Sequence, residues 1–392
     1  MDLDTLHWLR LPDGQALLDE LAQHDIRDAT LLNELQRLRA RYTPEQARAA
    51  VEQTMLRMRA RVKFSHADVM FFTREALEQA TAEPVARHRA GRIASHGMAS
   101  VVDLGCGIGG DALALAAAGL RVTAIDRDPL RVALAQANAE ALGLAERMTF
   151  VHADVVDAPP HADALFVDPA RRSGGRRVFD VGQYQPPLDR VFAWGAQTPA
   201  LCVKLAPGVP YEELAPPFAH EIECVSLHGE LKETTLWCGP FAAVSHRATV
   251  LPSGANLATT PNMPGAPLAE PAAFLYEPDP AVIRAHLVAE LAHELDAAQL
   301  DAQIAYLTSD QQIVTPFARA WRVLEWQPWQ LKRLRARLRA LDAGSVTVKK
   351  RGSPLDTDAL ARQLSGKGSR PLVVTLTRLQ EQPIAIICEQ IA

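Results

Sequence analysis

The chain has 392 residues and a formal net charge of −5, a length that accommodates two or three domains. The negative charge excludes a general attraction to nucleic acid, so any such partner has to meet a local basic patch. The five cysteines are scattered and form no C-x-x-C pair, which argues against a zinc site or a disulfide framework and predicts free thiols in a reducing cytoplasm. No apolar run approaches membrane-spanning length, and no secretory signal is visible.

Leucines recur at helical spacing within residues 1–60, where glycine is scarce. This pattern predicts a bundle of helices docked on the domain that follows. Thr43 is expected to cap a helix, and Pro44 is expected to lie in the first turn of that helix.

Residues 63–93 carry aromatic and basic side chains just before a glycine-rich stretch. Thr73 is expected to cap one helix, and a second helix is expected from about Pro84 to Arg92. Two interpretations of this segment stay open. In one, a lid covers a ligand and Arg89 holds a carboxylate or phosphate; in the other, the basic face is solvated and the phenylalanines belong to the core. The expected lid residues are Phe71, Phe72, Thr73 and Gln79 to Thr81.

Val101 to Asp111 reads VVDLGCGIGGD and predicts a strand, a tight turn and a helix. Glycines in the turn permit positive φ and close approach of a ligand to the backbone, and the helix directs its first amides into the same space. The glycine spacing differs from the G-x-G-x-x-G pattern of dinucleotide-binding proteins. Asp103 lies inside the strand, two residues before the first glycine.

Three further strands are predicted after this turn, and each delivers an acid to its end: Arg121–Asp126, Met148–Asp154 and Asp163–Pro169. Carboxylates at the carboxyl ends of parallel strands meet at one sheet edge and suit ribose hydroxyls. A fifth strand is expected over Ala200–Pro207. Its Lys204 should lie near the edge or be paired, because a buried unpaired ammonium is costly. Residues 221–237 are expected to form two more strands.

Asp168 opens the segment DPARRSGGRRVFD. Asp-Pro places a carboxylate and a rigid carbonyl at the sheet edge. Acceptors in the plane of an exocyclic amine can take its proton and raise its reactivity. The four arginines that follow are expected to clamp phosphates or stack on a base, the alternative being a solvated loop.

The C-terminal part is expected to begin with a linker or a long excursion over Leu251–Glu270, which is rich in Pro, Gly, Asn and Thr. A helix is expected to start within residues 276–280 and run through Leu295, and helices then alternate with strands, as in a small α+β domain. The tail is basic and its cations face few acids, which predicts an electrostatic footprint for phosphate backbones or a solvated helix face. The cations are Lys332, Arg333, Arg335, Arg337, Arg339, Lys349, Lys350, Arg351, Lys367 and Arg370.

Three features together resemble one bacterial family: the segment KFSHADVMFFTREALEQAT, the pair DLGCGIGGD and VDPARR, and the basic tail. They resemble the class I S-adenosylmethionine-dependent methyltransferases with a C-terminal THUMP-like domain. This family is related to trimethylguanosine synthase, which methylates the guanine exocyclic amine of RNA caps. The resemblance implies an α/β chain with an N-terminal helical domain (1–95), a Rossmann-like methyltransferase domain with a seven-stranded sheet (96–250), and a THUMP-like, ferredoxin-like RNA-binding region (270–392).

The same resemblance implies roles for individual residues and S-adenosyl-L-methionine as the cofactor. Cofactor contacts are expected from Asp103, Gly105, Cys106, Gly107 and Gly109 (methionine part), Asp126 (ribose), Asp154 with Val155 (adenine amine), and Arg127 and Asp168. Asp168 with Pro169 is expected to orient or deprotonate the acceptor, the exocyclic amine of a base in rRNA or tRNA, guanine being favoured. Substrate contacts are expected from Arg171, Arg172, Phe72, Arg89, Lys350 and Arg351.

The acceptor motif departs from that of amino-group methyltransferases, which have Asn/Asp-Pro-Pro followed by an aromatic. Ala170 replaces the second proline, and Arg171 stands where the stacking aromatic is usual. Two alternatives therefore stay open. One is a non-catalytic protein that binds cofactor and RNA, and the other is a methyltransferase of a small molecule or protein, for which the basic tail has no use.

Overall fold

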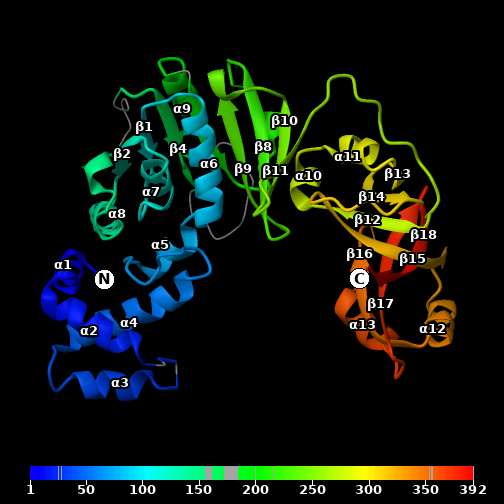
Figure 1. Cartoon of the computed structure of the whole chain (residues 1–392), viewed down its shortest axis with the longest axis horizontal. Helices are drawn as coiled ribbons and strands as arrows, with labels where there is room; N and C mark the ends of the chain where they lie inside the picture. Colours follow the sequence, from blue (N-terminus) through cyan, green and yellow to red (C-terminus); the bar gives the residue numbers. More distant parts are fainter. Residues whose placement is uncertain are drawn as a thin grey trace. The chain divides into compact units, whose positions relative to one another are not determined.

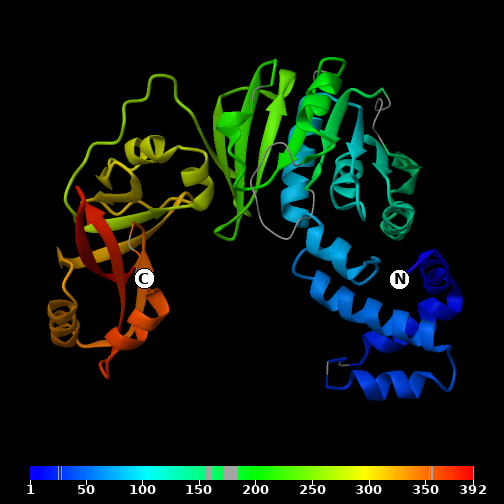
Figure 2. The ribbon, with the colours of Figure 1, turned by 180° about the vertical axis from the view of Figure 1, so that it is seen from behind.

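A computed structural model describes residues 1–24, 26–27, 29–154, 161–171, 184–198, 200–214, 216–352, 354 and 356–391. The chain divides into two compact units. The first comprises Met1–Glu221 and Glu233–Ala243, and the second comprises Ile222–Lys232 and Val244–Ala392. Figures 1 and 2 show the ribbon from opposite sides.

Side-chain caps mark the start of several helices of the first unit. Thr43 and Gln46 form a capping box, Thr73 accepts a hydrogen bond from the Ala76 N–H, and Asp128 accepts one from Leu130, so the predicted starts near Thr43 and Thr73 are confirmed. The helices are α1 (Leu3–Arg10), α2 (Pro12–Ala22), α3 (Leu31–Leu38), α4 (Pro44–Ala60), α5 (Arg74–Gln79), α6 (Glu83–Ser95), α7 (Gly110–Ala117), α8 (Pro129–Ala141) and α9 (Leu188–Gly195).

The strands of the first unit have the order β9-β7-β4-β1-β2-β3. All neighbours pair in parallel except β9, which runs antiparallel to β7. The sheet that holds these strands has nine strands among the described residues, so the expected count of seven is wrong. The chain winds outward in one direction from β1 and in the other from β4, so the strand order reverses between these two strands, where ligands of open α/β sheets bind. The strands are β1 (Ser100–Leu104), β2 (Arg121–Asp126), β3 (Met148–His152), β4 (Ala164–Val167), β7 (Leu201–Leu205) and β9 (Glu230–Cys238).

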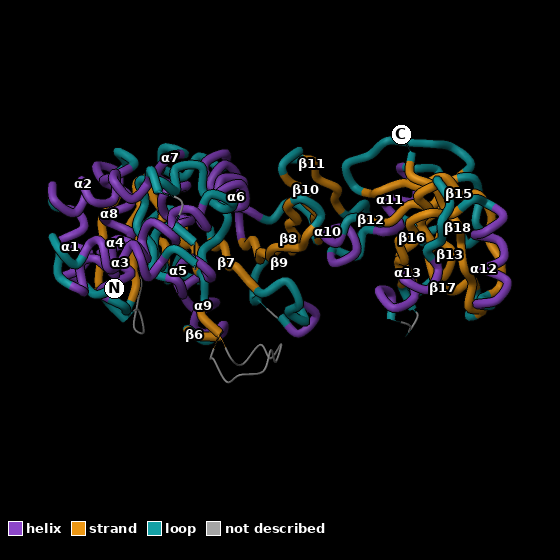
Figure 3. The backbone as a smooth tube through the Cα atoms, turned by 90° about the horizontal axis from the view of Figure 1, so that it is seen from below, coloured by secondary structure: helices purple, strands orange, loops and turns teal. Residues whose placement is uncertain are grey.

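Helices cover both faces of these strands, and α7 and α9 lie on opposite sides of them (Figure 3). A separate short ribbon pairs β5 (Ala170–Arg171) with β6 (Tyr184–Gln185). The predicted α/β Rossmann-like architecture is thus confirmed. Strong apolar runs in β1, β4 and β7 produce it, because strands covered on both faces need apolar side chains on both faces.

Buried side chains of the N-terminal helices join those of the sheet domain in one continuous cluster. Phe72 is 0 % exposed, which contradicts its expected contact with substrate and supports the alternative of core phenylalanines. Two buried amides fix this segment. Asn138 Oδ1 accepts the Phe71 N–H (2.6 Å) and its Nδ2 donates to the Ile108 carbonyl (3.0 Å), while Gln53 Oε1 accepts the Phe72 N–H (3.1 Å).

In the second unit, β8 (His220–Leu227) pairs in parallel with β10 (His246–Leu251), and β11 (Ala255–Ala258) pairs antiparallel with β10. The expected linker over Leu251–Glu270 is therefore wrong in part, because it contains β11. Asn256 in this strand pairs with Thr249, and its side chain accepts a hydrogen bond from Arg247 (2.8 Å). These cross-strand contacts give a short polar stretch a partner that its composition does not reveal.

A second sheet follows in the order β13-β14-β12-β15-β18-β17-β16, antiparallel except for β16 with β17. With its helices it confirms the expected α+β organisation. Its elements are β12 (Phe274–Pro278), α10 (Pro280–Arg284), α11 (Val288–Glu294), β13 (Ala298–Asp301), β14 (Ile304–Ser309), β15 (Ala318–Pro328), α12 (Leu331–Ala340), β16 (Ala343–Lys350), α13 (Thr357–Leu364), β17 (Arg370–Leu379) and β18 (Gln382–Gln390).

The single helix expected from residues 276–280 through Leu295 is wrong. Tyr276 lies in β12, and two short helices replace the long one because His286 has a left-handed backbone (φ 58°) between them. Leucines of α12 and α13 pack on one set of strand residues, and a second cluster surrounds Tyr306 and Trp321. Among the described residues, no helix is both long and apolar enough to cross a bilayer.

Candidate active site

The glycine turn is built around positions where a side chain does not fit. Gly105 has φ +90°, and a Cβ there would lie 2.8 Å from the carbonyl oxygen of Asp168. Gly109 (φ 89°) forms the N-cap of α7, and the Gly107 N–H donates to Asp126 Oδ2 at 2.9 Å. The turn is therefore fixed to the end of β2, and Asp168 lies against it.

The acids at the strand ends differ in their surroundings. Asp126 is buried and accepts hydrogen bonds from the N–H groups of Gly107 and Asp128, both at 2.9 Å. Arg127 is exposed and Asp154, at the end of the segment after β3, is also exposed. These residues and the turn, with its buried Cys106, surround the carboxyl end of the sheet. Val155 lies outside the described residues.

Asp103 is fully buried in β1, and neither of its carboxylate oxygens has a hydrogen-bond partner among the described residues. Burial, and then the negative charge of Asp168, raise the pKa of the Asp103 carboxyl to about 8, although Arg89 and Lys204 oppose this. A buried acid without a donor is costly when ionised. Asp103 can therefore accept a cation or hydrogen-bond donor that a ligand brings.

Hydrogen bonds fix both the backbone and the side chain of Asp168. Its N–H donates to the Leu104 carbonyl (3.1 Å), and Lys204 Nζ donates to Oδ2 (2.7 Å). Lys204 also donates to Thr81 Oγ1 (2.8 Å), so the predicted pairing of this lysine is confirmed. The Asp168 side chain is 33 % exposed, which leaves it accessible to an acceptor molecule. Pro169 is buried.

A buried chain of polar contacts continues from Thr81. Its hydroxyl donates to Asp111 Oδ2 (2.7 Å), Asp111 pairs with Arg89, and Arg89 pairs with Glu233. Arg89 is 1 % exposed, and its guanidinium lies 4.6 Å from the centre of the Phe166 ring. The expectation that Arg89 holds a ligand carboxylate or phosphate is therefore wrong, because two internal carboxylates occupy it.

Of the remaining expected substrate residues, two lie at or beyond the edge of the described residues and two belong to the second unit. Arg171 is described only as part of the β5 backbone, where it pairs with Tyr184, and Arg172 lies outside the described residues. Lys350 and Arg351 belong to the second unit. Lys350 is exposed, whereas Arg351 lies over the Tyr306 ring (5.7 Å from its centre) and 3.9 Å from Glu277.

Sequence reasoning assigned no site role to Lys204, Asp111 or Glu233. Lys204 interrupts an apolar strand, which was the one available signal. Asp111 directly follows the glycine turn, and Glu233 lies in β9, 144 residues from Arg89. Contacts at such separation leave no local pattern in the sequence.

Comparisons with known proteins agree with this geometry. The family model of a methyltransferase domain matches residues 101–167, a THUMP domain-like model matches residues 318–390, and a domain of unknown function matches residues 2–60. An uncharacterized S-adenosylmethionine-dependent methyltransferase of Mycobacterium tuberculosis is 39 % identical over 352 residues, which cover 87 % of this chain and 95 % of the relative. The chain belongs to the class I S-adenosylmethionine-dependent methyltransferases.

The fold of this methyltransferase also recurs in a crystal structure. A candidate methyltransferase from Porphyromonas gingivalis W83 matches with a TM-score of 0.71 at 18 % identity, over 94 % of this chain and 100 % of the other. The methyltransferase uses S-adenosyl-L-methionine as its cofactor and carries a C-terminal THUMP-like domain.

Proposed function

We propose that this methyltransferase acts on RNA and that the exocyclic amine of a base, guanine being favoured, accepts the methyl group. The observation that carries the proposal is Asp168, a partly exposed carboxylate against the glycine turn, in a chain whose residues 318–390 match a THUMP domain-like model. A carboxylate there suits an amine, which has to lose a proton when it is methylated.

The cofactor supplies a methyl group on a positively charged sulfur. We assign its methionine part to Asp103 and to the backbone of Gly105, Cys106, Gly107 and Gly109. Asp103 fits a cationic ammonium because its buried oxygens lack a partner among the described residues. We assign the ribose to Asp126 with Arg127, and the adenine amine to Asp154 with Val155.

Asp168 and Lys204 have different roles toward the acceptor. Lys204 occupies Oδ2 of Asp168, so Oδ1 is the oxygen that accepts a hydrogen bond from the acceptor amine. The carboxylate orients the amine and receives its proton, which can pass to solvent through the exposed third of the side chain. Catalysis then rests chiefly on alignment and on exclusion of water.

Support for RNA comes from the second unit, where several cations have no acidic partner among the described residues. We further propose that Arg171 and Arg172 contact the RNA backbone near the acceptor, because guanidinium groups bind phosphates in a bidentate manner.

We place the activity in the cytoplasm. All five cysteines are buried free thiols, as expected for a reducing compartment.

The test is incubation of the full chain with labelled S-adenosylmethionine and total RNA from a strain that lacks the gene. We expect label in RNA with the native chain and none with Asp168→Ala, while calorimetry finds that the variant still binds the cofactor. Asp189→Ala, which removes an exposed acid of α9, is the matched control and should transfer normally. Label that appears in protein or small molecules but never in RNA would refute the proposal.

A further inference from the structure

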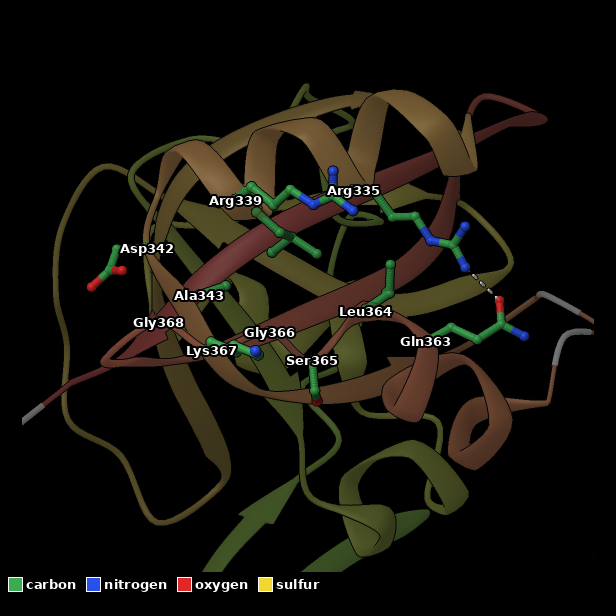
Figure 4. A pocket seen from close by; sticks show the side chains of 11 residues that line it. Arg335, Arg339, Asp342, Ala343, Gln363, Leu364, Ser365, Gly366, Lys367 and Gly368 are labelled. Carbon is green, nitrogen blue, oxygen red and sulfur yellow. Dashed lines mark hydrogen bonds between the residues drawn. The ribbon is translucent and has the colours of Figure 1, made fainter.

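The second unit contains a cavity of about 380 Å³ between α12, the start of β16 and the turn after α13. We call it the α12–α13 pocket (Figure 4). Its volume lies within the roughly 300–1,000 Å³ that is usual for ligand sites. Its principal lining residues are Arg335, Leu338, Arg339, Leu364, Ser365 and Lys367.

The turn of the pocket is pressed against the start of β16. Gly366 N–H donates to the Gly344 carbonyl (2.8 Å), and Gly368 N–H donates to the Ala343 carbonyl (3.1 Å). A Cβ at Gly366 would lie 2.6 Å from the Ala343 carbonyl oxygen. Close backbone contact on both sides of Lys367 therefore fixes the position of this lysine at the pocket.

The pocket gathers cations that the protein leaves unpaired. Among the described residues, Arg339 and Lys367 have no hydrogen bond or ion pair from their side chains. Arg335 donates to the neutral amide of Gln363 (3.1 Å), and its Nε is buried without a partner. Free donors on cationic side chains around a cavity favour an anionic ligand.

Three other cations of the basic tail are paired with acids, so the expectation that the tail faces few acids is wrong for these three. Arg337 binds Glu325 (2.6 Å), Lys349 binds Glu277 (2.6 Å) and Arg370 binds Glu389 (2.6 Å). The unpaired positive charge of this region is therefore concentrated at the pocket and on the exposed start of α12.

One acid, Asp342, also lines the pocket but is engaged elsewhere. Its Oδ2 accepts hydrogen bonds from the Ser369 N–H (3.1 Å) and hydroxyl (2.6 Å). Figure 4 shows its carboxylate directed away from Arg335, Arg339 and Lys367. It therefore does not neutralise the three cations.

We propose that the α12–α13 pocket binds one phosphate-bearing nucleotide of the RNA substrate. The phosphate contacts Arg339 and Lys367, and the ribose or base lies against the apolar side chains of Leu338 and Leu364. This inference rests on the proposed function for the identity of the ligand as RNA. It assigns recognition to residues other than Lys350 and Arg351, which do not line the pocket.

The test measures binding of a fluorescein-labelled, single-stranded RNA of about 12 nucleotides to the full chain by anisotropy, over a series of KCl concentrations. The pocket variant carries Arg339→Gln and Lys367→Gln. The matched control carries Lys332→Gln and Arg333→Gln, which remove the same charge from the exposed start of α12. Thermal melts of both variants verify folding.

We expect the pocket variant to bind at least about tenfold more weakly and to have a salt slope shallower by about one to two, with less than about a threefold loss in the control. Equal losses in both variants would mean that only net charge matters, and unchanged binding would mean that the pocket is unused; either result overturns the inference. Inorganic phosphate and uridine monophosphate then compete with the RNA at matched ionic strength. Stronger competition by the nucleotide supports a nucleotide site, and equal competition overturns it.

A methyl-transfer assay separates this inference from the proposed function. If the native chain methylates RNA and the pocket variant does so with an unchanged KM, the pocket inference fails and the function stands. If the native chain methylates no RNA, the proposed function fails. Weaker binding of the labelled RNA by the pocket variant alone would still support the pocket in that case.

Discussion

The ammonium of Lys204 lies 2.7 Å from the carboxylate of Asp168. Lys204 comes from β7 and Asp168 follows β4, which are neighbouring parallel strands. The pair therefore joins two strand ends at the edge that holds the glycine turn. Because the lysine also contacts Thr81, the segment before α6 takes part in positioning the acid.

Replacing Lys204 tests this relationship. Lys204→Met removes the partner of Oδ2 and lets the carboxylate rotate, so we expect kcat to fall by at least about tenfold. The affinity for S-adenosylmethionine should stay within about threefold of native, since the lysine contacts the acid and not the glycine turn. Rates come from transfer of labelled methyl groups and affinities from calorimetry. Lys232→Met, on an exposed ion pair with Glu230, is the control, and native turnover in Lys204→Met would contradict the assigned role.

Asp103 should make the stability of the cofactor-free enzyme depend on pH. Its carboxyl ionises near 3.8 in an ordinary environment but at about 8 in the folded chain. Between these values the folded state binds more protons than the unfolded state, so the contribution of Asp103 is full below pH 3.8 and is lost as the pH rises to about 8. Asp103→Asn cannot titrate. In denaturant unfolding at several pH values, the free energy of unfolding of Asp103→Asn should rise relative to that of the native chain across this window. A difference between the two free energies that does not change with pH would argue against the raised pKa.

Cofactor binding should draw a proton from the same residue. A cationic ammonium beside Asp103 favours the ionised carboxylate, so about one proton should leave per cofactor bound near pH 7. Calorimetry in two buffers of different ionisation enthalpy measures this release. Asp103→Asn should bind more weakly and release none, whereas equal release by both proteins would place the titrating group elsewhere.

Arg89 should be essential for folding stability. Arg89→Met leaves Asp111 and Glu233 buried without their cation, a change that costs about 3–5 kcal/mol in comparable cases. Arg87→Met on the same helix removes an exposed arginine that pairs with Glu83 and should change stability by less than about 0.5 kcal/mol. Urea unfolding compares the two, and similar losses would mean that the buried contacts contribute little.

Gly105 should tolerate no side chain. Gly105→Ala places a Cβ against the Asp168 carbonyl at a backbone φ of +90°, so we expect at least about a tenfold loss of turnover and weaker cofactor binding. Gly143→Ala shares the positive φ but meets no atom within 4 Å. Gly143→Ala therefore measures the conformational cost of a side chain at positive φ, about 1–2 kcal/mol, without the clash. Equal activity of the two variants would show that the clash has no consequence for the site.

Local patterns predicted the parts of the molecule that are locally determined. Apolar runs ending in Asp103, Asp126 and Asp168 marked strands whose carboxyl ends meet, and Thr43 and Thr73 marked helix starts. Lys204 could be expected to be paired, because an ammonium in an apolar strand needs a partner. These inferences rest on spacing and on single-residue chemistry, and they hold without knowledge of distant neighbours.

Other features depend on partners that spacing does not reveal. Arg89 appeared to be a candidate ligand contact, but its charge is satisfied by Glu233 from a remote strand. Glu325 likewise neutralises Arg337 from another element. Asn138 is a polar residue that is fully buried, because the backbone of Phe71 and Ile108 supplies its hydrogen bonds.

Gln53 and Asn138 hold consecutive backbone amides, those of Phe72 and Phe71, although one comes from α4 and the other from α8. A graft that replaces residues 2–60 with those of a relative would take Gln53 from a different parent than Phe72, whose N–H it accepts. Chimeras of this family should therefore take α4, residues 64–72 and α8 from the same parent.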